Sequence, residues 1–130
     1  MIPKEQLQSK ADSMNAYLQE KASDEPNDII DRINNLSILI SQSGECLAAA
    51  NYYKDTLIHS EIMKIMREGM VDRLSATALN KLVNALAKEE SYLVNQFDRI
   101  NSAAVHSLDG LRSVLSYRKA EFSTLSYARS

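Results

Sequence analysis

Apolar residues recur along the chain at intervals of three and four, which is the spacing of one face of an α-helix. In the first segment this repeat comprises Leu7, Ala11, Met14, Leu18 and Ala22. Charged and amide side chains lie between these positions, so the pattern predicts an amphipathic helix over about 4–22. The segment 23–28 then combines turn-forming residues, a proline and candidate N-caps, which predicts a break in the chain.

A second and longer repeat follows this break. Its nine positions alternate in steps of four and three: Ile29, Ile33, Leu36, Ile40, Ser43, Leu47, Ala50, Lys54 and Leu57. Because these positions share one seam, the pattern predicts a helix over about 28–68. Gly69 stands where a C-terminal cap is expected, and Ser75 or Thr77 is the expected N-cap of the next helix.

The third segment also has helical spacing, in a region without proline. Its apolar positions are Leu79, Leu82, Leu86, Leu93, Phe97, Ile100, Ala104, Leu108, Leu111, Leu115, Phe122 and Leu125. We therefore expect one helix over about 76–123. Gly110 is the only turn signal in this range, and one glycine costs a helix only about 1 kcal/mol relative to alanine, so the helix should continue through it.

The last two helices are each about 60 Å long at about 1.5 Å per residue, and a short turn near residue 72 joins them. We expect an antiparallel hairpin in which paired residue numbers sum to roughly 144. The expected pairs are Leu47 with Phe97, Ile40 with Ala104, Ile33 with Leu111, and Ile29 with Leu115. The predicted fold is thus a single all-α domain over 1–130, in which the helix 4–22 packs on the hairpin as a three-helix bundle or coiled-coil-like structure.

The helix 4–22 is too short to cover the whole hairpin, and we expect it to lie against 29–50 and 95–122. The other half then carries a large apolar set: Leu57, Ile58, Ile62, Ile65, Met66, Met70, Val71, Leu74, Leu79, Leu82, Val83, Leu86 and Leu93. Exposed apolar surface of this extent marks an interface, so we predict a homo-oligomer, with a dimer favoured. The candidate interface residues are Leu57, Ile58, Ile62, Ile65, Met66, Leu79, Leu82 and Leu86.

Composition narrows the chemistry. The chain has 130 residues, a formal net charge of -2, three glycines, two prolines and one cysteine, which excludes a disulfide scaffold and disfavours a β-sandwich. His59 and His106 lie on different helices about 30 Å apart by the expected register, so they cannot share a metal. The isolated glycines exclude a phosphate-binding loop. We therefore expect no enzyme activity, no metal and no cofactor.

The chain also lacks the marks of export and membrane insertion. The first residues carry no basic region followed by an apolar stretch, and apolar runs are four residues at most. A cytoplasmic location without membrane association is expected.

One stretch near the C-terminus is rich in cations. Arg112, Ser116 and Lys119 are spaced to share a helix face, and we expect Tyr117 and Arg118 beside it. Such a face can bind phosphates, and a tyrosine can stack on a base, so these five residues are candidate contacts for single-stranded nucleic acid or for a partner. The alternative is a structural role, because cations in the last turns of a helix favour its dipole.

Residues 108–121, which follow a long helix containing Tyr92 and Asn101, carry a resemblance to a known group. An Arg-Ser pair, a Leu-Ser-Tyr triplet, basic residues and Glu121 succeed one another there. This order resembles the C-terminal portion of small helical proteins of unknown function encoded by tailed phages and prophages. The resemblance implies a link to phage DNA metabolism, because related genes often lie near those for single-strand annealing recombinases. The helix 4–22 has no counterpart in it.

Three hypotheses follow. The favoured one is a non-enzymatic helical interaction or scaffold protein of phage or mobile-element origin, with a further protein partner. The alternative is an accessory protein of phage DNA recombination that contacts single-stranded DNA through the basic helix face. The third is a bundle that holds a small apolar ligand between its helices.

Overall fold

The computed structural model describes the backbone of residues 1–129 and the side chains of 1–70 and 72–125. Four α-helices occupy most of this part of the chain: α1 (Lys4–Gln19), α2 (Pro26–Arg67), α3 (Ala76–Leu86) and α4 (Lys88–Arg129). A short 3-10 helix, Val71–Arg73, lies between α2 and α3. The described elements are all helical, which confirms the predicted all-α class.

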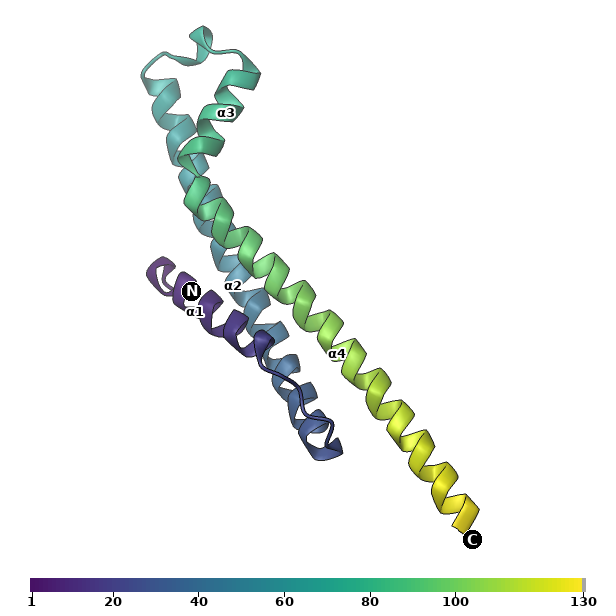
Figure 1. The fold of residues 1–130 in the computed structure, drawn as a ribbon. Coiled ribbons are helices and arrows are strands. Elements are labelled where there is room, and N and C mark those ends of the chain that lie inside the picture. The colour runs from purple at the N-terminus through teal and green to yellow at the C-terminus, as the bar shows by residue number, and fades with distance from the viewer. Residues whose placement is uncertain (130) are drawn as a thin grey trace.

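The long helices α2 and α4 run antiparallel, with α1 on one side of them (Figure 1). A buried polar contact marks their register. Asn101 on α4 donates hydrogen bonds from Nδ2 to the carbonyl oxygen of Ile40 at 3.1 Å and to Ser43 Oγ at 2.9 Å. Residues 43 and 101 sum to 144, so the predicted hairpin register is confirmed.

The core lies in the middle of the hairpin, where three helices meet. It is formed by Leu7, Ala11, Met14, Leu36, Leu39, Cys46, Ala49, Ala50, Leu93, Phe97, Ile100, Ala104 and Leu108. Phe97 is the largest fully buried side chain of this core. Two expected pairings, Leu47 with Phe97 and Ile40 with Ala104, fall in this cluster or at its edge.

Helix α1 runs antiparallel to α2, and polar contacts fix it along the central part of the hairpin. Near its start, the Tyr53 hydroxyl donates to the Ile2 carbonyl oxygen at 2.6 Å. At its other end, the Arg32 guanidinium donates to the Tyr17 carbonyl oxygen at 3.0 Å and lies over the Tyr17 ring.

Two contacts place α1 on α4 as well. Lys4 pairs with Glu90, and the side-chain amides of Gln8 and Gln96 exchange two hydrogen bonds of 3.0 Å. The expectation that the N-terminal helix covers α4 over 95–122 holds only for the first part of this range, where Leu7 and Met14 share the core with Phe97. Because α1 begins opposite Glu90 and ends at Gln19, three residues earlier than predicted, the C-terminal part of α4 lies beyond its reach.

The turn between the two arms of the hairpin follows the predicted capping residues. Gly69 has a φ of 68°, a left-handed conformation that suits glycine, just after the end of α2. Ser75 caps α3, because its hydroxyl accepts a hydrogen bond of 3.1 Å from the Ala78 amide.

The predicted single helix over 76–123 is interrupted. Ala87 has a φ of -98° and a ψ of 22° and separates α3 from α4, which then continues through Gly110 to Arg129. Ala87 is fully buried, and Ile65 on α2 and Val83 on α3 are buried as well. We attribute the break to packing, since it lets α3 turn its apolar side onto α2. Glu89 and Glu90 lie in the first turn of α4, where carboxylates favour the helix dipole.

The ion pair between Lys4 and Glu90 makes the attachment of α1 dependent on pH. Glu90 is only 4% exposed. Burial by itself raises the pKa of Glu90, but hydrogen bonds from Lys4 and a backbone amide, with the charge of Lys4, lower the pKa further than burial raises it. The pair thus stabilises the fold fully above the pKa of a free glutamate, about 4.3, and loses its effect as the pH falls through the lower pKa of the folded state.

We predict that Glu90→Gln lowers the free energy of unfolding by about 1.5 kcal/mol at pH 7, because it removes a charged hydrogen-bond partner. Urea titrations followed by circular dichroism at pH 7 and at about pH 3 should show this difference shrinking in acid. The control is Glu89→Gln, at an exposed neighbouring position. An equal loss at both pH values would contradict the ionic role of Glu90.

Candidate functional site

The turn end of the hairpin exposes apolar side chains from α2, α3 and the segment between them. We call these exposed residues the tip patch, and they are Met63, Met66, Met70, Leu82 and Leu86. Methionine side chains are flexible and polarizable, which suits a surface that adapts to a partner. Met66 is the most exposed of the five, at 56%.

The tip patch is smaller than the sequence predicted. Of the eight candidate interface residues, Met66, Leu82 and Leu86 are exposed, whereas Leu57, Ile58, Ile62 and Leu79 are half-buried and Ile65 is buried. Val83 and Leu93, which we expected in the bare half, are buried as well. The break at Ala87 accounts for the difference, because α3 covers part of α2 that a straight helix leaves open. Val71 lies outside the described side chains.

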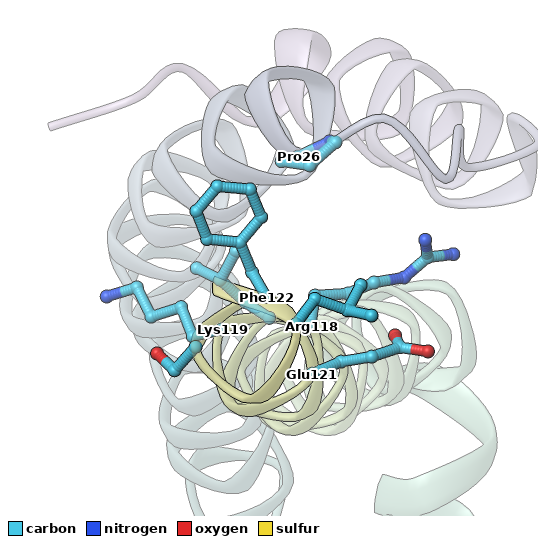
Figure 2. Close-up of a pocket in the computed structure, with 8 residues that line it drawn as sticks. Pro26, Arg118, Lys119, Glu121 and Phe122 are labelled. Carbon is cyan, nitrogen blue, oxygen red and sulfur yellow. The ribbon is translucent and has the colours of Figure 1, made fainter. Parts of the chain in front are cut away.

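The five candidate contacts of the basic stretch are all exposed on α4. They do not form one continuous surface. At about 100° per residue, Arg112, Ser116 and Lys119 share one flank of the helix, while Tyr117 lies on the side opposite the apolar seam. Figure 2 shows Arg118 and Lys119 pointing away from each other, on either side of Phe122.

Between these two cations lies a groove that the sequence analysis missed. We call it the open-end groove, and it is lined by Pro26, Leu115, Arg118, Lys119, Glu121, Phe122, Ser123 and Leu125. Its volume is about 510 Å³. The Phe122 ring points toward Pro26 across it (Figure 2), and Phe122 is 75% exposed.

The signal for this groove was present in the sequence. The apolar seam of α4 continues through Leu115, Phe122 and Leu125, whereas the predicted register places Pro26, the start of α2, opposite Arg118. Seam residues beyond Arg118 therefore have no α2 residue to pack against.

The remaining chemically active side chains do not gather. Among the described residues, no group of three or more His, Cys, Asp and Glu side chains is placed to hold a metal. His59 and His106 are exposed on different helices. Burial raises the pKa of the Cys46 thiol, and Glu45 adds to this while Lys10 opposes it, so the thiol is protonated at neutral pH.

Comparison of the chain with family models, with curated proteins and with solved structures finds no match. Over the part of the chain that the structure describes, no helix is both long enough and apolar enough to cross a membrane.

Proposed function

We propose that this protein is a non-enzymatic helical interaction or scaffold protein, which acts by presenting apolar surface at the tip of its hairpin. The observation that carries the proposal is the tip patch itself. Five large apolar side chains are exposed on the elements at the turn end of an elongated bundle, whereas chemically active residues lie apart. An apolar surface of this kind supports a protein partner.

The partner that the tip patch supports best is a second copy of the chain, with a dimer as the favoured state. A two-fold contact uses the same patch on both copies, so one patch is sufficient for the interface. A further protein that docks on the patch is the other outcome of the same experiment. The resemblance of 108–121 to small phage helical proteins supports an origin in a phage or mobile element.

The double variant Met66→Lys with Leu86→Lys tests the tip contact. Both positions lie in the last turn of a helix, where a cation favours the helix dipole, so the fold should be retained. We expect sedimentation velocity at tens of micromolar to show a lower average mass for the double variant than for the unmodified protein. The reason is that two charges per copy would have to be desolvated in the contact.

The matched control replaces two exposed polar residues of the same helices, Ser60→Lys with Asn80→Lys, and should leave the mass unchanged. If the double variant and the unmodified protein have the same average mass, the tip contact does not form.

A second candidate function, single-stranded DNA binding, is favoured by the charge of α4. The stretch 112–119 holds three cations and no carboxylate, and all of its candidate contacts are exposed. This candidate corresponds to the accessory role in phage DNA recombination. Because Arg112 and Lys119 share a flank of the helix, they are the residues to test together.

We expect a fluorescent oligothymidine to bind at tens of micromolar in low salt if this candidate holds, and Arg112→Ala with Lys119→Ala to weaken the binding several-fold. Each lost phosphate contact should also make the salt dependence shallower. Fluorescence anisotropy measures both quantities, and Lys64→Ala with Arg67→Ala is the control for net charge. Binding that is absent, or that the Arg112 and Lys119 substitutions leave unchanged, would reject DNA binding by this face.

A further inference from the structure

The two long helices of the hairpin end at different heights. The register set by Ser43 and Asn101 places Pro26, the first residue of α2, opposite Arg118. Helix α4 continues to Arg129, which extends it past α2 by about 16 Å at about 1.5 Å per residue. Figure 1 shows this free C-terminal end of α4 beyond the start of α2.

The part of α4 that extends past α2 still carries an apolar seam, as if another helix packed against it. Phe122 and Leu125 continue the helix face that packs against α2 nearer the middle of the hairpin. Leu125 is nevertheless 56% exposed, and Phe122 is 75% exposed. Ile30 and Val114, at the same end, are exposed too. Because α1 ends at Gln19 beside Arg32, it covers none of these four side chains. The open end therefore has the surface of a helix pair that lacks a further helix.

Charge at the open end is divided between the two helices. Residues 24–31 carry four carboxylates and no cation, and all four carboxylates are exposed. The basic stretch 112–119 lies at the same height on α4, because these ranges pair in the hairpin register. Within the described side chains, the ion pairs join Lys4 to Glu90 and Arg32 to Glu20, so neither charged stretch is neutralised by a direct pair inside the molecule.

From these observations we infer that the open end is a two-fold docking surface for the open end of a second copy. In this arrangement the copies lie antiparallel, and the basic stretch of each α4 faces the acidic residues 24–31 of the other copy. The free end of each α4 covers the open-end groove of its partner. Phe122 and Leu125 are then removed from water on both copies.

The division of charge is the reason to choose a second copy over other occupants. An acidic helix would meet the cations of α4 but would be repelled by the carboxylates of 24–31, and a basic partner would meet the opposite conflict. A two-fold rotation satisfies both stretches at once, because the acidic surface of one copy meets the basic surface of the other twice.

This contact is separate from the tip patch, since the two surfaces lie at opposite ends of the hairpin. The experiment therefore starts from the Met66→Lys, Leu86→Lys protein, in which the tip contact is disabled. We expect this protein to remain a dimer by sedimentation at tens to hundreds of micromolar. A monomer throughout this range would overturn the open-end contact, whatever the tip patch does in the unmodified protein.

Two charge reversals in that background test the pairing. Arg118→Glu with Lys119→Glu leaves Arg112 as the one cation of the basic stretch and makes the open end mostly acidic. Asp24→Lys with Glu25→Lys makes it mostly basic, at positions outside the body of α2. Each protein alone should dimerise at least tenfold more weakly. An equimolar mixture of the two should recover the dimer, because both contacts become attractive again. Reversals that leave dimerisation unchanged, or a mixture that stays monomeric, would overturn the inference.

Two further proteins separate the charge and apolar parts of the contact. Lys10→Glu with Lys81→Glu changes the net charge equally at exposed sites away from the open end, and should not affect dimerisation. Phe122→Ser keeps the charge but removes the exposed ring of the groove, and should weaken the dimer at least tenfold. The unfolding midpoint should be unchanged at concentrations where both proteins are monomeric, since the ring is exposed in the single chain. A dimer as tight as before would show that the groove is not part of the contact.

Discussion

The hydrogen bonds from Asn101 to Ser43 and Ile40 are the contact on which the rest of the architecture depends. They lie inside a seam of apolar side chains, and Ser43 is fully buried. A shift of one helix turn between α2 and α4 keeps many apolar contacts but takes the Asn101 amide away from both of its acceptors, whereas Ser43 keeps its bond to the Ile40 carbonyl oxygen within α2. An amide left without a partner between packed helices costs about 1 kcal/mol or more. The polar pair therefore selects one register among several that apolar packing alone would tolerate.

The register in turn decides which parts of the hairpin remain open. With residues 43 and 101 side by side, α4 extends past the start of α2 at one end, and α2 is left for α3 to cover at the other. Helix α1 has 16 residues, against 42 in each long helix, so it fills only the middle. Apolar side chains are buried where three helices pack together, and they remain exposed at the two ends of the hairpin, where only two helices or one are present.

Sequence periodicity predicted the structural features that depend on residues close in the sequence, and it missed the features that depend on packing between distant segments. The seams of α2 and α4, the positive φ of Gly69 and the cap at Ser75 each follow from residues close in sequence. Ala87 gives no such signal, because alanine is the best helix former, and only the burial of Ile65 and Val83 explains the interruption there.

The open-end groove was hidden for a related reason. The seam residues Phe122 and Leu125 look identical in sequence to buried ones, and only the position of Pro26 on the other helix shows that they lack a neighbour.

The two open surfaces differ in the kind of recognition they support. The tip patch relies on flexible methionines and apolar area, which give affinity with little orientation and accept partners of varied shape. The open end carries apolar side chains between stretches of opposite charge, which fix both the direction and the partner of a contact, because any displacement brings like charges together. Where the tip patch takes a further protein and not a second copy, the open-end dimer is a rod with one tip patch at each end. The length of the hairpin then sets how far apart the two bound partners are held.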